Sequence, residues 1–230
     1  MKSLYYKNNL TFKLSITGIL LSISLLALYF SHTLLNWPIF TLGLKVDLST
    51  LFILPIFMVS GIYFGILALI IRFVLGPFII FQGIESTSLQ AQYFSHFIFL
   101  LSSIIFLFTF TFLDWIANKK DLQAKKNKKK LFLHLLISVL TTTFLMSILN
   151  GFWITPTYFY IFRLTESSSY FATLNKWSQI ADNFGAKNFD YWGFIALAYI
   201  PFNLLNFAIT SLLSIPLYFV ITNFFKKNGK

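Results

Sequence analysis

The 230-residue sequence contains no cysteine and only seven acidic residues. Without cysteine, the chain forms no disulfide bond and offers neither a thiol nucleophile nor a thiolate ligand for a metal. Charged residues make up only 11% of the chain, whereas 57% of its residues are hydrophobic and 20% are aromatic. Such a composition excludes an ordinary water-soluble domain and indicates a protein of the lipid bilayer.

Motifs that hold nucleotides or metals are also missing. No G-x-x-x-x-G-K-[ST] occurs, so the chain itself has no P-loop for ATP, and no H-E-x-x-H or other close metal-binding spacing occurs. The three histidines, His32, His96 and His134, lie far apart, and we predict that each is a lone polar residue rather than a metal ligand. Because no Ser-His-Asp setting is recognisable either, we expect no enzymatic activity, no bound metal and no cofactor.

Acidic residues are scarce where the sequence is most apolar. No pair of carboxylates is expected in the membrane core. Proton-coupled carriers usually carry acids inside their membrane spans, where such groups relay protons. This absence counts against a stand-alone secondary carrier, as does the lack of a visible inverted repeat.

What the chain does contain is a series of apolar runs long enough to cross a bilayer, which takes about 20 residues. They predict one integral membrane domain over residues 1–230, an all-α bundle of six transmembrane helices. The stretch 48–80 is too long for one crossing, and Ser60-Gly61 divides it into a short helix and a longer one. The predicted helices cover residues 14–31, 48–59, 62–80, 92–116, 131–155 and 191–222.

The lysines indicate the topology. The net charge of +11 would suit nucleic acid, but the lysines flank apolar runs, which is typical of a cytoplasmic membrane face. Residues 119–130 hold seven lysines and one acid. We therefore predict a cytoplasmic lysine-rich loop at 118–130, an even number of crossings, and both termini in the cytoplasm. The sequence predicts a multi-pass plasma-membrane protein with no nucleic-acid partner.

Two segments are predicted to form loops on the outer face. Residues 157–190 are the longest non-apolar stretch, and they carry apolar side chains at the spacing of a short amphipathic helix: Tyr170, Phe171, Leu174, Trp177 and Ile180. This helix either lies on the outer surface or forms a lid over a pocket. In the other loop, residues 31–47, Lys45 and Asp47 are spaced to pair at the surface. Arg72, inside a predicted span, either has a partner within the bundle or extends its side chain to a membrane interface.

Amides and aromatic rings gather toward the predicted outer face, above all in residues 147–160. There Pro156 should end or kink the helix, and Asn150 needs a hydrogen-bond partner because it lies in an apolar run. One interpretation is a helix end in the aromatic belt of a bilayer. The other is a pocket for a planar heterocycle. Its candidate residues are Gln92, Asn150, Trp153, Tyr158, Asn203 and Asn206.

Three stretches carry a resemblance to a known family. They are LSTLFILPIFMVSGIYFGILALIIRF at 48–73, SILNGFWITPTYFYIF at 147–162 and IPFNLLNFAITSLLSIPLYF at 200–219. In this order they resemble the riboflavin-binding S components (RibU) of energy-coupling factor (ECF) vitamin transporters. Asp47 falls where that family tends to carry an acid, which adds it to the candidate substrate-binding residues.

The resemblance implies a membrane subunit that captures riboflavin from outside as the transported ligand. It also implies partners, namely one transmembrane coupling subunit and two cytoplasmic ATPases. In that family, small residues on the first helix dock the coupling subunit, and here Gly18 and Ser22 form the small-xxx-small pair. Asn150 matches an amide near the end of the fifth helix that contacts ligand in the family.

The chain departs from the family pattern in two places that touch the site. Asn206 stands where riboflavin binders tend to carry lysine, and the 157–190 loop is longer than expected. Two alternatives therefore stay open. One is an S component for another vitamin, such as a folate or pyridoxine, and the other is a stand-alone secondary carrier.

Overall fold

The computed structural model describes residues 10–35, 37, 44–80, 88–118 and 128–228, whose regular elements are helical. The elements are α2 (Leu10–Leu34), α3 (Thr50–Val59), α4 (Ile62–Ile80), α5 (Leu89–Asn118), α6 (Lys128–Leu149), the π-helical turn η1 (Asn150–Ile154), α7 (Thr155–Ile161), α8 (Tyr170–Ile180), the 3-10 turn η2 (Ala181–Phe184) and α9 (Tyr191–Asn228).

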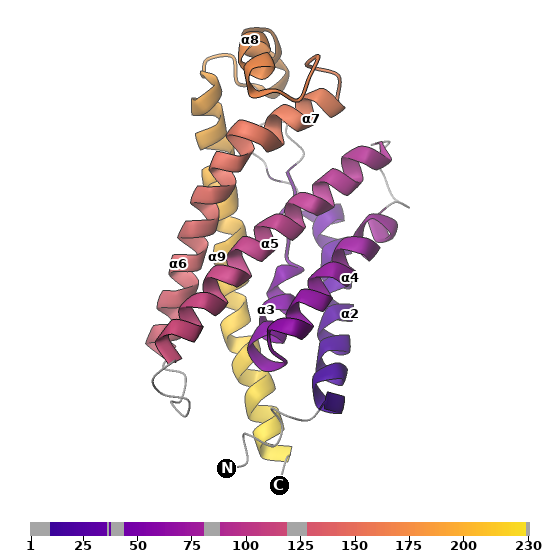
Figure 1. Ribbon diagram of the computed structural model, residues 1–230, viewed down its shortest axis with the longest axis vertical. Helices are drawn as coiled ribbons and strands as arrows, with labels where there is room; N and C mark the ends of the chain where they lie inside the picture. Colours follow the sequence, from indigo (N-terminus) through magenta and orange to yellow (C-terminus); the bar gives the residue numbers. More distant parts are fainter. Residues whose placement is uncertain (1–9, 36, 38–43, 81–87, 119–127, 229–230) are drawn as a thin grey trace.

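Five of these helical segments are long and apolar enough to cross a membrane: α2, α4, α5, α6 continued through α7, and α9. The prediction of an all-helical membrane protein is confirmed to this extent. The remaining predicted helix, 48–59, exists as α3. Its ten residues span only about 15 Å, roughly half of a hydrocarbon core. In Figure 1, α3 occupies the half of the bundle near the start of α2, and an extended segment precedes it in the other half.

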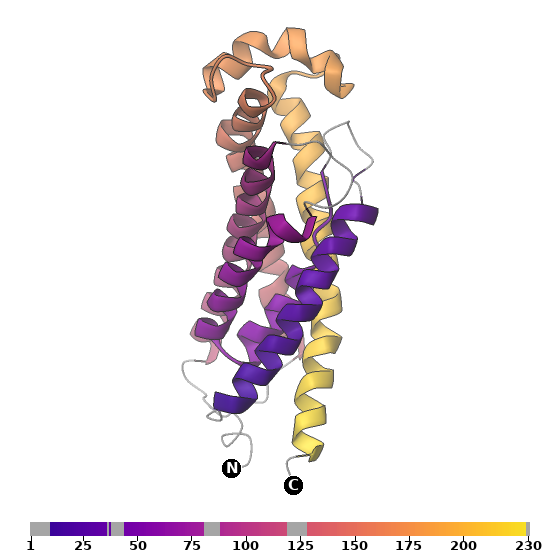
Figure 2. The same cartoon turned by 90° about the vertical axis from the view of Figure 1, so that its right-hand side faces the viewer.

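In the elongated bundle, α2, α4 and α6 run toward one end, whereas α3, α5 and α9 run the opposite way (Figure 1). Figure 2 shows that the first residues of α2 and the last residues of α9 lie at one end, while α8 crosses the opposite end. We call residues 155–194, which comprise α7, α8, η2 and the first turn of α9, the cap. The predicted 118–130 loop lies largely outside the described residues, although α5 ends and α6 begins at the end remote from the cap (Figure 1).

The chain stays helical past residue 155, where the predicted helix ends, and the regular α-helix is interrupted just before Pro156. A π-helical turn precedes the proline, in which the Thr155 N–H donates to the Asn150 carbonyl, five residues back. In this register the next donor would be Pro156, which has no N–H. The freed Gly151 carbonyl instead accepts a hydrogen bond from the Tyr191 hydroxyl at 2.6 Å. The wide turn and the tyrosine together let the helix continue to Ile161.

The same turn brings α9 unusually close. The Trp192 ring packs over Gly151, where a Cβ atom would collide with it. Thr155 Oγ1 also donates to the buried Tyr199 hydroxyl at 3.0 Å. The end of α6, the start of α7 and the start of α9 are therefore held against each other by Gly151, Pro156, Tyr191 and Tyr199.

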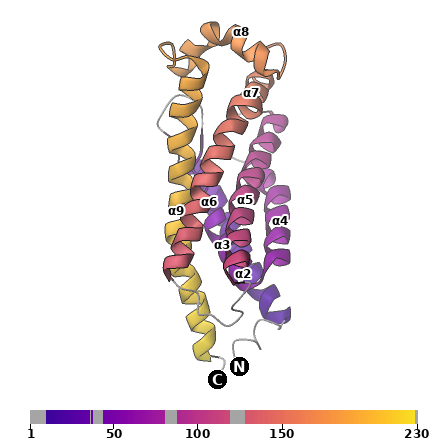
Figure 3. The same cartoon turned by 60° about the vertical axis from the view of Figure 1, so that its left-hand side comes forward.

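The cap has its own hydrophobic core. Trp177 of the predicted amphipathic helix is buried between Phe159 and Phe194, with ring centroids 6.4 and 4.8 Å away. Its Nε1 donates to the Phe189 carbonyl at 2.9 Å. The helix prediction for this segment is confirmed, since α8 buries Trp177 and Ile180 on one face. Figure 3 shows α8 lying across the ends of α7 and α9.

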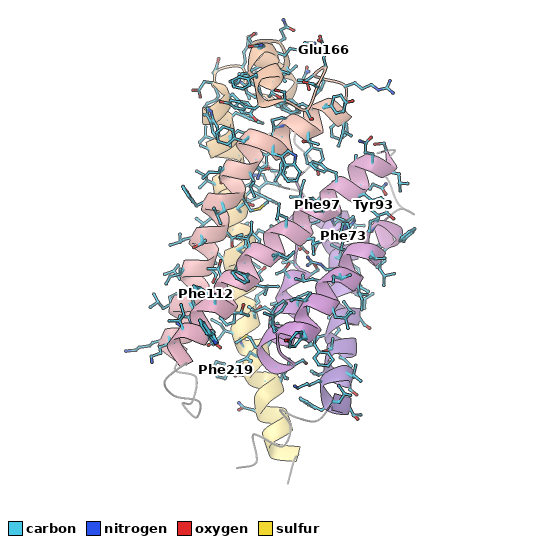
Figure 4. All side chains as sticks on the ribbon, in the orientation of Figure 1. Phe73, Tyr93, Phe97, Phe112, Glu166 and Phe219 are labelled. Carbon is cyan, nitrogen blue, oxygen red and sulfur yellow. The ribbon has the colours of Figure 1, made fainter. Side chains whose placement is uncertain are left out.

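A second core lies within the bundle and surrounds α3. Ile53, Leu54 and Ile56 are fully buried there. Phe106 of α5 stacks on Phe207 of α9 with ring centroids 5.0 Å apart. Many large apolar side chains on the outer faces remain exposed, and Figure 4 shows one of them, Phe112, at the periphery. Outward-facing apolar surface of this kind is what lipid contact requires.

Candidate functional site

A buried ion pair lies at the centre of the bundle, where the extended segment 44–49 meets α3. Arg72 of α4 approaches Asp47 at 3.4 Å, and both side chains are only 3% exposed. The predicted partner of Arg72 within the bundle is thus Asp47. The predicted surface pair of Lys45 and Asp47 is wrong, because Asp47 points into the interior and Lys45 Nζ donates to the His32 carbonyl at 3.0 Å.

Hydroxyl groups complete the surroundings of the two charges. The Asp47 carboxylate accepts hydrogen bonds from the Ser49 N–H at 2.8 Å, the Ser49 hydroxyl at 2.5 Å and the Thr50 hydroxyl at 3.1 Å. Arg72 also donates to the Ser49, Thr50 and Ser103 hydroxyls at 2.6–2.9 Å. Both carboxylate oxygens are therefore used within the protein, which is the condition under which a charge is tolerated in a low-dielectric interior.

The backbone of the extended segment is hydrogen-bonded by side chains. The Asp47 N–H donates to Asn206 Oδ1 at 2.8 Å, and the Leu48 N–H donates to the Ser31 hydroxyl at 3.1 Å. The Ser24 hydroxyl donates to the Ser49 carbonyl at 2.9 Å. Irregular backbone at membrane depth is tolerated only when such groups are satisfied internally. Asn206, a predicted ligand residue, is here an anchor for this segment.

The ion pair also corrects one sequence inference. An acid was not expected in the membrane core, yet Asp47 is 2% exposed and lies among spanning helices. The sequence assigned Asp47 to an outer loop because no helix periodicity covers residues 31–47. The chain instead carries part of that stretch inward, since Arg72 and Asn206 supply partners for it.

Two other predicted amides are buried and retain unused hydrogen-bonding groups. Asn150 is 4% exposed, and its Nδ2 donates to the Met146 carbonyl in its own helix at 2.7 Å. Among the described residues, nothing donates to its Oδ1. Asn203 is also 4% exposed, and its Nδ2 is buried without a hydrogen-bond partner. One turn separates it from Asn206 on α9.

Trp153 and Tyr158 connect the α6–α7 segment to α5. The Tyr158 hydroxyl forms a 2.6 Å hydrogen bond with the Ser95 hydroxyl, and its ring lies 5.0 Å from Phe94. Trp153 is 41% exposed and meets Phe94 and Phe97 edge-on. Figure 4 shows Phe97 on the half of α5 toward the cap.

Gln92, the remaining predicted residue, is partly buried one turn before Ser95 on α5. The structure thus brings together Asp47 with Asn206, and Tyr158 with α5. It shows no direct contact between these two groups among the described residues.

Sequence reasoning missed Trp37 as a candidate, because Asn36-Trp37-Pro38 indicated only a loop. Its indole Nε1 is buried without a hydrogen-bond partner, and its ring meets Phe202 edge-on with centroids 5.6 Å apart. Its backbone N–H donates to the Leu44 carbonyl at 2.8 Å. A tryptophan beside a proline carries no sequence signal for this packing.

Two of the histidines predicted to be lone residues are neighbours in space. The His32 and His96 rings stack with centroids 5.6 Å apart, and both lie edge-on to Phe99. His134 Nδ1 lies 4.0 Å from an Asp114 oxygen. In the part of the chain that the structure describes, no three His, Cys, Asp or Glu side chains form a possible metal site.

The predicted docking pair lies on an outward face of α2. Gly18 and Ser22 are both exposed, and the Ser22 hydroxyl donates to the Gly18 carbonyl at 2.9 Å. A Cβ atom at Gly18 would meet nothing within 4 Å. The face is therefore flat and open to another helix, although the structure shows none on it.

We predict that Arg72→Met lowers the melting temperature of the detergent-solubilised protein strongly. Removing one partner of a buried pair leaves a buried charge and costs about 3–5 kcal/mol. The double variant Asp47→Asn/Arg72→Met should recover part of this loss. Lys176→Met, which breaks the exposed pair with Glu166, is the matched control and should have little effect. An Arg72→Met protein as stable as wild type would contradict this prediction.

No known protein family, curated protein or solved structure matches this chain. The resemblance to riboflavin-binding S components therefore depends on the residues quoted above, and the site depends on the geometry of this structure.

Proposed function

We propose that this chain is the substrate-binding S component of an ECF-type transporter, which captures riboflavin from outside the cell for uptake driven by partner ATPases. The observation that carries the proposal is the pair of buried amides, Asn150 and Asn203, each with an unused hydrogen-bonding function. A buried amide N–H without a partner costs about 1–3 kcal/mol. A ligand that supplies the missing partners would offset this cost.

The chemistry of the surrounding residues favours a flat heterocycle. Aromatic residues lie near the amides along the chain: Trp37 contacts Phe202, which precedes Asn203, and Trp153 follows Asn150 by three residues. Binding sites for such ligands are typically apolar and aromatic, with a few fixed polar groups. An isoalloxazine ring offers flat faces for these side chains and alternating donors and acceptors for the amides.

The topology follows from the same proposal. The extended segment 44–49 and α3 together make one crossing, so the chain crosses six times. The protein lies in the plasma membrane. Its lysine-rich loop and both termini face the cytoplasm, and its cap lies on the outer side. The amides then lie toward the outer half of the bundle, where a ligand arrives.

We predict that a cysteine at Lys176 on α8 is labelled by an impermeant reagent on intact cells, whereas a cysteine at Lys126 is labelled only after permeabilisation. The natural chain contains no cysteine, so each variant reports a single position. Labelling of position 126 with protection of position 176 would reverse the topology.

We predict that Asn150→Leu weakens riboflavin binding about five- to a hundred-fold, which corresponds to about 1–3 kcal/mol. The substitution roughly keeps the volume and removes both hydrogen-bonding functions. Quenching of riboflavin fluorescence by the purified protein measures the affinity. Asn175→Leu on the exposed side of α8 is the matched control and should bind like wild type. Unchanged affinity in folded Asn150→Leu would move the site, and no quenching by wild type would exclude riboflavin.

One observation favours a second candidate, a secondary carrier. Asp47 and Arg72 are ionisable groups inside the membrane region, where such groups often serve coupling. Ser49 and Thr50 donate hydrogen bonds to the Asp47 carboxylate and Arg72 pairs with it, so both carboxylate oxygens already have partners. This favours a structural role, and riboflavin accumulation by vesicles that contain this chain alone would instead support the carrier.

We predict that Gly18→Leu lowers copurification with a co-expressed ECF coupling subunit and lowers riboflavin uptake, while it leaves riboflavin binding intact. A bulky side chain on the open face of α2 blocks close helix approach. Ser178→Leu on exposed α8 is the control and should assemble normally. Loss of binding with normal assembly would show that this face is not the docking surface.

A further inference from the structure

Two buried N–H donors belong to segments that contact each other in the first third of α9. Trp37 Nε1 and Asn203 Nδ2 are both buried without a hydrogen-bond partner. The Trp37 ring touches Phe202, the residue before Asn203, at a centroid distance of 5.6 Å. Among the residues that the structure describes, these two donors have no acceptor, which is rare for buried polar groups.

The positions of both donors are fixed by contacts around them. Asn206, one turn after Asn203, holds the Asp47 N–H at 2.8 Å, so α9 is tied to the extended segment. The Trp37 N–H donates to the Leu44 carbonyl at 2.8 Å, which ties Trp37 to the start of that segment. Two donors fixed in this way are preorganised, since binding does not have to order them.

The charges nearby indicate what kind of acceptor fits. Arg72 is paired with Asp47, and Lys45 Nζ donates to the His32 carbonyl. Indole and amide N–H groups are neutral, so two of them stabilise a buried carboxylate or phosphate less than a cationic partner does. A carbonyl oxygen of an uncharged ring system accepts such hydrogen bonds without introducing a net charge.

We infer that Trp37 and Asn203 form a donor pair that binds the carbonyl edge of an uncharged, planar ligand. This inference rests on the proposed function and adds Trp37 as a ligand-binding residue. For riboflavin, the acceptors are the carbonyl oxygens of the pyrimidine-dione ring. Asn150 Oδ1 is left to accept an N–H of the ligand, so donors and acceptors are supplied by different helices.

Trp37→Phe tests the donor directly, because it removes the indole N–H and keeps an aromatic ring against Phe202. The expected result is a five- to hundred-fold loss of riboflavin affinity, measured by quenching of flavin fluorescence. Trp115→Phe is the matched control, since that side chain is 58% exposed near the end of α5 remote from the cap, and it should change affinity less than two-fold. Wild-type affinity in Trp37→Phe would overturn the inference, although the proposed function would stand. Absence of riboflavin binding by wild type would overturn both.

A structural role is distinguished from a binding role by the stability of the ligand-free protein. Asn203→Leu removes a buried donor that has no partner, so the ligand-free melting temperature should stay equal or rise while riboflavin affinity falls. A lower melting temperature with unchanged affinity would show that Asn203 serves the fold and would overturn the inference.

The identity of the acceptor is tested with riboflavin analogues in which sulfur replaces the C2 or the C4 carbonyl oxygen. Sulfur is a weaker acceptor, so the analogue altered at the bound carbonyl should lose less affinity through Trp37→Phe than riboflavin does. Equal losses for riboflavin and both analogues would show that Trp37 does not bind either carbonyl.

Discussion

The buried pair of Asp47 and Arg72 holds the bundle in its observed form. Through Ser49, Thr50 and Ser103 it connects the extended segment with α3, α4 and α5, and through the Asp47 N–H it reaches α9. Two charges in a low-dielectric interior require that nearly every polar atom around them be hydrogen-bonded. The hydroxyl-rich sequence LST at 48–50 meets this requirement. Because the pair holds a non-helical segment inside, α3 can be short.

The residues that hold the fold together differ from the residues that are proposed to bind a ligand. The Asp47 carboxylate and the Asn206 amide have their partners within the protein, so neither offers a free group to a ligand at these atoms. Asn150, Asn203 and Trp37 retain unused functions that are all neutral. Riboflavin-binding S components, which the sequence resembles, tend to carry lysine where this chain has Asn206, and the amide fits this division. An amide at that position accepts the Asp47 N–H, which a lysine ammonium cannot do because it has no acceptor.

Sequence reasoning succeeded where a single helix determines the answer. Apolar runs located the long helices, and the spacing of Trp177 and Ile180 located α8. It failed where two distant segments cooperate. The continuation of the helix past Pro156 was not foreseen, because Tyr191, 40 residues away along the chain, satisfies the Gly151 carbonyl. Asp47 was placed outside because its partner Arg72 lies 25 residues further on, and Trp37 was missed because its contact with Phe202 leaves no local pattern.

The cost of the unsatisfied donors is significant because the net stability of a folded protein is small. A folded domain is stable by only about 5–15 kcal/mol, and each buried N–H without a partner costs about 1–3 kcal/mol. Two backbone groups at awkward positions are satisfied, because the Tyr191 hydroxyl donates to the Gly151 carbonyl and the Ser31 hydroxyl accepts from the Leu48 N–H. Among the described residues, the Thr142, Thr143 and Ser211 hydroxyls are also buried without a partner. A fold that satisfies those backbone groups and leaves Trp37 and Asn203 open keeps a cost that the proposed ligand would remove. Ligand binding then stabilises the protein in proportion to that relief, since anything that binds only the native state shifts the folding equilibrium toward it.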